Sequence, residues 1–287
     1  MKTLLILEGG GLRGIYTAGV LDTFMKNNIK IDTVIGVSAG ALFGINYLSN
    51  QKGRVIRYNL DNIKNKNYMG ISSWIRTGNI MNKDFCFDKL IYETDPFDFE
   101  TFNKSKSDFF AVVTNVVTGK AEYIKIDDIE NQMEYLRASG SMPVVSKIVR
   151  IKGKKYLDGG ISDSIPIKWG LKNGYKKIIV IETRPKEYRK KKNNITNFLF
   201  RKIYKKYPNF VNTYKNRYKN YNKAKDYIEK LEEENRVFVI RPSELIKISR
   251  IEKNKDKIQE MYRLGMRDAN NKLNEMKRYL KWKDVIG

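Results

Sequence analysis

The 287-residue sequence contains no histidine and only one cysteine, Cys86. The absence of histidine excludes a serine hydrolase triad of the usual Ser-His-acid type, and it also removes histidine as a metal ligand. A single cysteine cannot form an internal disulfide, which fits a reducing compartment. Because Cys86 has no partner residues near it in the sequence, we interpret it as a packing residue.

Long hydrophobic runs are also missing. No stretch approaches the roughly 18 apolar residues of a membrane-spanning helix. The apolar run near the N-terminus is stopped by Glu8 and lacks the small-residue cleavage site of a signal peptide. We therefore expect a soluble, cytoplasmic protein whose contact with a membrane would be peripheral.

Acidic residues are scarce, since 32 Asp and Glu stand against 56 Lys and Arg, for a net charge of +24. Much of the excess lies in residues 184–225, which contain 15 basic residues and one acidic residue. Such a region suits an anionic membrane or a nucleic acid. The alternative, that these are solvated lysines in a chain generally rich in Lys, Asn, Ile and Tyr, remains open.

The start of the chain predicts two strand–helix units. Residues 2–10 hold an apolar run followed by glycines, and residues 14–28 carry apolar side chains at helical spacing. Residues 32–38 predict a second strand and residues 39–50 a second helix. This alternation favours right-handed crossovers and a mainly parallel sheet with helices on both faces.

Similar patterns continue to the end of the chain. They predict a strand pair over 108–119 and 121–126, a short helix over 131–140, a hairpin over 149–160, a strand over 176–184, a long helix over 207–234, a late strand over about 236–241 and a closing helix over 252–280. We expect the late strand to return to the edge of the same sheet. The composition nevertheless changes near residue 184, which divides the chain into region 1–184 and a basic, mainly helical region 185–287.

The first glycine cluster, Gly9, Gly11 and Gly14, matches the G-x-G-x-x-G of dinucleotide-binding loops. A dinucleotide site also needs an acidic residue at the end of the second strand, whereas Asp32 lies at its start. We favour a loop that presents bare backbone N–H groups, at a helix N-terminus, to an oxyanion.

The second strand ends in G-x-S-x-G, with Ser38 between Gly36 and Gly40. This pattern is typical of a serine nucleophile on a sharp strand-to-helix turn. Without histidine its base must be another residue type, and the best candidate is Asp158, at a predicted strand end. Gly159 and Gly160 follow it and leave its carboxylate unhindered, although a lone Asp-Gly-Gly is also an ordinary turn.

Together, the segments G-G-G-L-R-G, G-V-S-A-G and D-G-G resemble, in this order, the motifs of the patatin-like phospholipase family. The segment A-S-G-S-M-P-V-V-S at 138–146 is similar to the stretch before the aspartate in bacterial members. The resemblance covers about residues 4–172, within a catalytic domain at 1–184. The remaining chain resembles the C-terminal extension of one bacterial subgroup.

The resemblance implies a three-layer α/β/α fold and a Ser38–Asp158 dyad, with Ser38 as nucleophile and Asp158 as proton acceptor. It further implies an acyl-enzyme and an oxyanion hole, and it requires no metal or other cofactor. The oxyanion hole would comprise Gly9, Gly10, Gly11, Leu12, Arg13 and Gly14.

We therefore expect a lipid acyl hydrolase, similar to a phospholipase A or a lipase, that acts on phospholipid esters. Residues 186–225 would contact an anionic membrane, and no nucleic-acid partner is expected. Two alternatives stay open: a nucleic-acid-binding protein that uses the basic, tyrosine-bearing segment, and a lipid acyltransferase or slow regulatory protein on the same fold. The sequence leaves the preferred lipid and the oligomeric state open.

Overall fold

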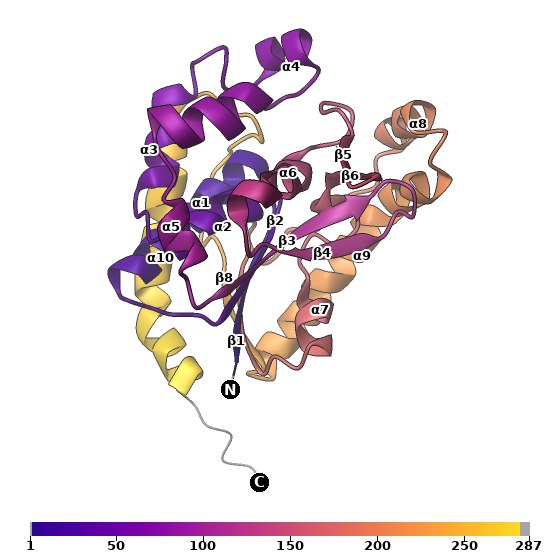
Figure 1. The fold of residues 1–287 in the computed structure, drawn as a ribbon. Coiled ribbons are helices and arrows are strands. Elements are labelled where there is room, and N and C mark those ends of the chain that lie inside the picture. Colours follow the sequence, from indigo (N-terminus) through magenta and orange to yellow (C-terminus); the bar gives the residue numbers. More distant parts are fainter. Residues whose placement is uncertain (1, 282–287) are drawn as a thin grey trace.

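A mixed sheet of eight strands forms the centre of the computed structural model, which describes residues 2–281 (Figure 1). The strands are β1 (Thr3–Leu7), β2 (Thr33–Val37), β3 (Asp108–Asn115), β4 (Ala121–Lys125), β5 (Val149–Ile151), β6 (Lys154–Asp158), β7 (Lys177–Ile181) and β8 (Val237–Ile240). They lie in the order β5-β6-β3-β2-β1-β7-β8, and β4 pairs with β3. The run from β3 to β8 is parallel, which confirms the predicted mainly parallel sheet.

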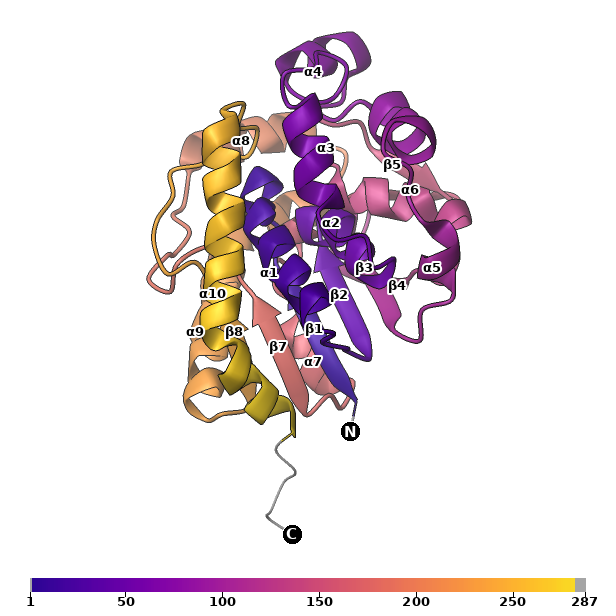
Figure 2. The same ribbon diagram turned by 90° about the vertical axis from the view of Figure 1, so that its left-hand side faces the viewer.

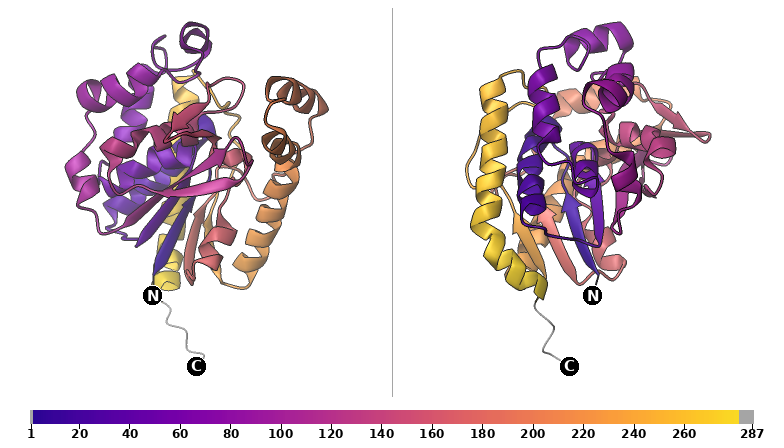
Figure 3. Two further views of the ribbon diagram at one scale, coloured as in Figure 1. Left: turned by 45° about the vertical axis from the view of Figure 1, so that its right-hand side comes forward. Right: turned by 60° about the vertical axis from the view of Figure 1, so that its left-hand side comes forward.

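Helices cover both faces of this sheet. The α-helices are α1 (Ile15–Lys26), α2 (Ala39–Leu48), α3 (Arg54–Asn62), α4 (Ile71–Thr77), α5 (Phe99–Asn103), α6 (Ile129–Gly140), α7 (Ile167–Lys172), α8 (Asn194–Ile203), α9 (Pro208–Glu233) and α10 (Lys255–Lys281). Two 3₁₀ turns and a π-helix complete the set: η1 (Gly11–Gly14), η3 (Gly159–Ile161) and η2 (Phe85–Thr94). Figure 2 shows α1, α3 and α10 in front of the sheet, and Figure 3 (left) shows the orange helix α9 to the right of the sheet, on its other face.

The parallel strands are buried on both faces, as their nearly continuous apolar sequences predict. In β1, Leu5 and Leu7 pack into the core beneath α1, α2 and α10, whereas Leu4 and Ile6 pack into a second core beneath α7 and α9. The predicted three-layer α/β/α architecture is therefore confirmed.

Strand β3 has two different partners along one edge. Val112 pairs with Val37 of the parallel strand β2, and the next residue, Val113, pairs with Asp158 of the antiparallel strand β6. Strand β4 pairs with residues of β3 that also face β2 and β6, so it occupies the opposite edge. Strands β2 and β6 therefore run toward each other and end at adjacent positions.

The chain after β7 returns to the same fold, as expected for the late strand. Strand β8 extends the sheet in parallel with β7, and α10 packs closely against α1. At their crossing, a Cβ on Gly19 would lie 2.2 Å from the Tyr262 carbonyl oxygen, and a Cβ on Gly265 would lie 2.1 Å from that of Tyr16. The backbones of these two helices therefore touch.

The predicted boundary at residue 184 stays a prediction. Residue 1 and residues 282–287 of the two predicted regions lie outside the described residues. In the part of the chain that the structure describes, no helix is both long and apolar enough to cross a bilayer.

The helix crossing gives a prediction about stability. Replacing Gly265 with alanine should lower the free energy of unfolding by about 1–3 kcal/mol, because the new methyl group overlaps the backbone of α1. Denaturant unfolding measures this change. The control is Asn274→Ala, on an exposed part of the same helix, which should change stability by less than about 0.5 kcal/mol. Equal effects of both substitutions would contradict a backbone contact at Gly265.

Candidate active site

Ser38 occupies a strained turn between β2 and α2. Its φ of 56° and ψ of −123° lie in a region that residues other than glycine rarely adopt. The flanking glycines are required by close contacts: a Cβ would lie 2.5 Å from the Ala41 Cα at Gly36, and 2.4 Å from the Leu7 carbonyl oxygen at Gly40. The turn therefore presents Ser38 at the C-terminal end of β2, as the G-x-S-x-G pattern predicts.

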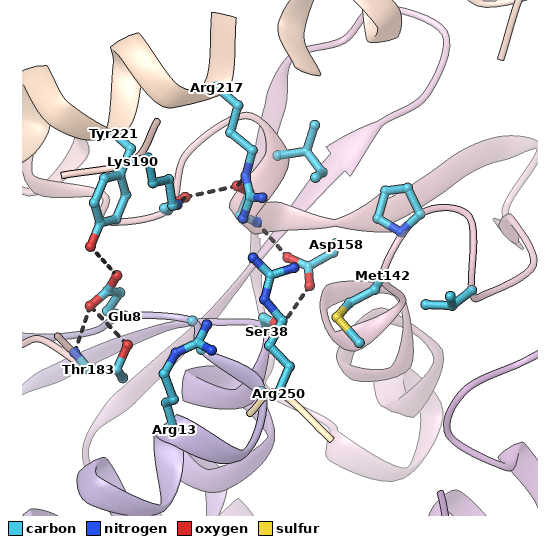
Figure 4. A pocket seen from close by; sticks show the side chains of 18 of the residues that line it. Glu8, Arg13, Ser38, Met142, Asp158, Thr183, Lys190, Arg217, Tyr221 and Arg250 are labelled. Atoms are coloured by element: carbon cyan, nitrogen blue, oxygen red, sulfur yellow. Dashed lines mark hydrogen bonds between the residues drawn. The ribbon is translucent and has the colours of Figure 1, made fainter. Parts of the chain in front are cut away.

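Asp158 lies directly beside Ser38 (Figure 4). The Ser38 hydroxyl donates a 2.6 Å hydrogen bond to Oδ2 of Asp158, and both residues are buried. The second carboxylate oxygen, Oδ1, accepts a 2.7 Å hydrogen bond from the N–H of Gly160. The Thr114 hydroxyl donates to the carbonyl oxygen of Asp158 at 2.8 Å. These contacts fix the carboxylate so that one oxygen faces the serine.

The surroundings of Asp158 raise its pKa above the ordinary value. Burial is the main cause, and it outweighs the hydrogen bond from Ser38 and the positive charge of Arg217, which act in the opposite direction. A raised pKa makes the carboxylate a stronger base than an exposed aspartate. Ionising this carboxyl group costs more in the folded protein than in the unfolded chain. Its contribution to the free energy of unfolding is therefore fully present at low pH and is lost as the pH rises through the raised pKa.

The glycine loop lies between β1 and η1, against the serine. A Cβ on Gly9 would come within 2.9 Å of the Ser38 Cβ. Among the described residues, the N–H groups of Gly9 and Gly10 have no hydrogen-bond acceptor. The N–H of Leu12, another residue of the predicted oxyanion hole, instead donates to the Arg250 carbonyl oxygen at 3.1 Å and is occupied.

The rest of the predicted set, Gly11, Arg13 and Gly14, belongs to the 3₁₀ turn η1. The Arg13 side chain lines the cavity beside the serine. The use of this loop as an oxyanion hole stays a prediction.

Glu8, at the end of β1, was not predicted as a site residue. Its Oε1 accepts a 2.8 Å hydrogen bond from the Tyr221 hydroxyl, and its Oε2 accepts bonds from the N–H (2.6 Å) and the hydroxyl (3.1 Å) of Thr183. The carboxylate thus joins the loops after β1 and β7 to α9. No local motif marks Glu8, because its partners lie 175 and 213 residues away in the sequence.

Two cavities meet at Ser38. The first, which we call the charged cavity, has a volume of about 300 Å³ and is lined by charged side chains together with apolar ones such as Ile80, Val145 and Phe200 (Figure 4). The second is smaller, about 90 Å³, and is walled mainly by apolar side chains, among them Leu42, Phe43 and Leu90. Both cavities are lined by Ser38 and by Gly11, Met142 and Arg250.

Five basic side chains line the first cavity: Arg13, Arg184, Lys190, Arg217 and Arg250. Only Arg13 was in the predicted site. Lys190 and Arg217 belong to the basic segment 186–225, in which sequence reasoning placed a membrane-facing surface. The structure turns these two inward, and it pairs Lys225 of the same segment with buried Glu182 at 2.6 Å.

Tyr214 and Tyr221, which lie in the predicted long helix, also line this cavity. Within residues 2–281, no three His, Cys, Asp or Glu side chains are grouped in a way that could hold a metal ion. Cys86 is buried, and burial raises the pKa of its thiol well above the usual range, which is consistent with a packing residue.

Comparison with known families gives two matches. A model described as "Patatin-like phospholipase" matches residues 5–168, and one described as "Domain of unknown function (DUF6363)" matches residues 207–281. The chain is also 31% identical over 192 residues to "Uncharacterized protein YjjU" of Escherichia coli, a match that covers 65% of this chain and 53% of that protein.

A "Lysophospholipase NTE1" of Debaryomyces hansenii is 28% identical over 188 residues, which is 62% of this chain and 11% of that protein. The match thus spans about half the length of YjjU and about a tenth of the yeast protein. Among solved structures, VipD from Legionella pneumophila aligns with a TM-score of 0.46 and 15% identity, over 96% of this chain and 67% of that chain.

The raised pKa of Asp158 gives a prediction about reactivity. A fluorophosphonate probe should label Ser38, and the labelling rate should fall as the pH drops through a midpoint above about 3.9, the ordinary aspartate value. The cause is protonation of Asp158, since the chain has no histidine to titrate there. The measurement needs protein without a histidine tag. In Asp158→Asn, the labelling that remains should no longer fall at low pH. If its rate fell at the same pH as in the wild type, the titration would belong to another group.

Proposed function

Because the chain belongs to the patatin-like phospholipase family, we propose that it is a lipid acyl hydrolase with a catalytic Ser38–Asp158 dyad. The observation that carries this proposal is the hydrogen bond from the Ser38 hydroxyl to Asp158, on a strained turn and beside unoccupied backbone N–H groups. A serine can be activated by an adjacent general base, and here the carboxylate fills that role directly.

In the proposed reaction, the Ser38 oxygen forms a bond to the ester carbonyl carbon while its proton passes to Asp158. The carbonyl oxygen becomes an oxyanion, which the N–H groups of the glycine loop stabilise. One such donor contributes about 10²–10³ in kcat in a well-studied protease. The departing alcohol takes the proton from Asp158 and leaves an acyl-enzyme. Water then attacks the acyl-enzyme while Asp158 accepts its proton. As the bond between the acyl carbon and the Ser38 oxygen breaks, Asp158 returns this proton to Ser38 and the fatty acid is released.

The apolar cavity supports a lipid as the substrate. It begins at Ser38 and continues between side chains such as Phe43, Leu90 and Leu136, so an acyl chain there would be removed from water. We assign the ester to the junction of the two cavities, because Ser38 lines both of them. The nucleic-acid alternative leaves the dyad without a role. It would also use the tyrosines of the basic segment, but Tyr214 and Tyr221 line the cavity.

We also propose that α4 and α8 place the enzyme on an anionic lipid surface. Both helices lie at the end of the molecule toward which β1 runs (Figure 1). Each exposes an apolar face; the exposed residues are Ile71, Trp74 and Ile75 on α4, and Ile195, Phe198, Leu199 and Ile203 on α8. On its inner side α8 contributes Phe200 to the wall of the charged cavity, so its exposed face lies at the rim of the site.

The charges around α8 complement an anionic surface. Lys191 and Lys192 are exposed and lie just before the cap residue Asn193, and the exposed Lys205 and Lys206 lie just after the cap residue Tyr204. Apolar side chains flanked by lysines are the pattern of helices that lie in a membrane interface. This narrows the predicted membrane contact of residues 186–225 to α8 and its flanks.

The first test concerns the dyad. Ser38→Ala and Asp158→Asn should each lower kcat for ester hydrolysis by about 10³-fold or more, and the double variant should be little worse than either, because residues that act as a unit are not additive. The matched control is Asp163→Asn, a carboxylate on the same segment that bonds Tyr123. It should keep most of the activity. If Asp158→Asn kept more than about a tenth of the activity, another base would be required.

The second test concerns the surface. Lys191→Gln with Lys192→Gln should weaken binding to anionic vesicles about 30-fold, at roughly 1 kcal/mol per lysine. Binding measured by sedimentation should also fall at high salt. The matched control, Lys219→Gln with Lys223→Gln, removes the same charge from exposed positions on α9 and should bind nearly as wild type. Equal loss in both pairs would show that only net charge matters and would overturn docking through α8.

A further inference from the structure

The charged cavity beside Ser38 carries an excess of positive charge. Its five basic side chains face two carboxylates, Glu8 and Asp158. Both carboxylates are already engaged, Glu8 by Tyr221 and Thr183, and Asp158 by Ser38 and Gly160. The excess charge therefore has no counterion among the residues that the structure describes.

The contacts of the basic side chains agree with this. Across the described residues, none of the five forms a salt bridge with a carboxylate. Arg13 is only 9% exposed, and its Nε has no hydrogen-bond partner. A buried donor without a protein partner is rare and is commonly satisfied by water, an ion or a ligand.

Lys190 is half-buried in the wall of the same cavity. Its Nζ stands 3.6 Å from the centre of the Tyr221 ring and 3.4 Å from the Ser164 hydroxyl oxygen. Arg217 donates through Nε to the Gly160 carbonyl oxygen, which leaves the rest of its guanidinium beside Asp158. The side chain of Arg250 is exposed at the junction of the two cavities.

Burial and mutual repulsion lower the pKa values of two of these basic side chains, Arg13 and Lys190. Burial and then the charges of Arg184 and Arg250 lower the pKa of Arg13 to about 10. Burial, and after it the charge of Arg217, lower the pKa of Lys190 well below its usual range. An anion in the cavity would relieve this repulsion.

We propose that this cavity binds the phosphate group of the lipid headgroup, so that the substrate is a phosphate-bearing acyl ester whose acyl chain enters the apolar cavity. This inference rests on the proposed hydrolase function. Guanidinium groups bind phosphate oxygens in a bidentate manner, and several cations together match a group with one or two negative charges. A volume of about 300 Å³ is at the lower end for ligand sites, which suits a headgroup of about the size of glycerol phosphate.

Most of this site comes from the end of the chain. Only Arg13 lies within residues 5–168, the part that matches the family model, whereas Arg184, Lys190, Arg217 and Arg250 follow it. Arg217 and Arg250 lie in residues 207–281, which match the domain of unknown function. The proposal thus assigns to this region the recognition of the substrate headgroup.

The test compares two soluble esters, 1-octanoyl-glycerol 3-phosphate and 1-octanoyl-glycerol, both below their micelle concentrations. The wild type should prefer the phosphate ester. Lys190→Gln with Arg250→Gln should lower kcat/KM for that ester by about 100-fold, because a hydrogen bond to a charged group is worth about tenfold or more. The loss for the uncharged ester should be far smaller. Lys219→Gln with Lys223→Gln, which removes the same charge outside the cavity, should leave both values unchanged.

Direct binding separates this inference from the hydrolase proposal. Glycerol 3-phosphate should bind Ser38→Ala in calorimetry, and the Lys190 and Arg250 substitutions should abolish that binding, even if no ester is hydrolysed. If the double variant unfolds, the same binding measurement can be made with Arg250→Gln alone. This variant should stay folded, because the Arg250 side chain is exposed and makes no hydrogen bond among residues 2–281.

Three results would overturn the headgroup site. The first is an equal loss of kcat/KM for the two esters in the Lys190 and Arg250 double variant. The second is an absence of glycerol 3-phosphate binding, and the third is binding of inorganic phosphate by an enzyme that does not prefer the phosphate ester. The last result would indicate a site for free phosphate.

Discussion

The site depends on one constraint in the sheet, namely that β2 and β6 share an edge of β3. Because Val37 and Asp158 face adjacent residues of β3, the residue after Val37 must emerge beside the Asp158 carboxylate. Strand register is strongly specified where side chains are packed in a core, because a slip by one residue would move every side chain of the strand to the other face. The hydrogen bond between Ser38 and Asp158 therefore follows from core packing, although the two residues are 120 positions apart.

The carboxyl end of the sheet brings together groups from the whole chain. Glu8 after β1, Ser38 after β2 and Thr183 after β7 lie together because parallel strands end on one side, where ligands commonly bind in such sheets. The C-terminal region contributes contacts of its own, through the Tyr221 hydroxyl on Glu8 and the Arg250 carbonyl oxygen on Leu12. The glycine loop is thus held by segments from both ends of the chain.

Local patterns predicted the parts of the structure that depend on neighbouring residues. The eight strands, the turn at Ser38 and the strand end at Asp158 all carry apolar runs or glycines that act over a few positions. Residues 51–107 were not assigned, and they contain short helices and the π-helix η2, whose hydrogen bonds do not follow a 3.6-residue pattern. The inward direction of Lys190 and Arg217 was missed because a run of basic residues looks the same whether it faces solvent or a cavity.

Asp158 itself shows how the basic cavity and the dyad are connected. Burial raises its pKa, while Arg217 and Arg250 lower it and so weaken it as a base. In the proposed complex, a bound phosphate would neutralise part of that positive charge, which would raise the pKa of Asp158 further. The base would then be strongest when the cavity holds a headgroup and weaker when the cavity is empty. An excess of cations beside a carboxylate base is costly for the free protein, but it links headgroup binding to the strength of the base.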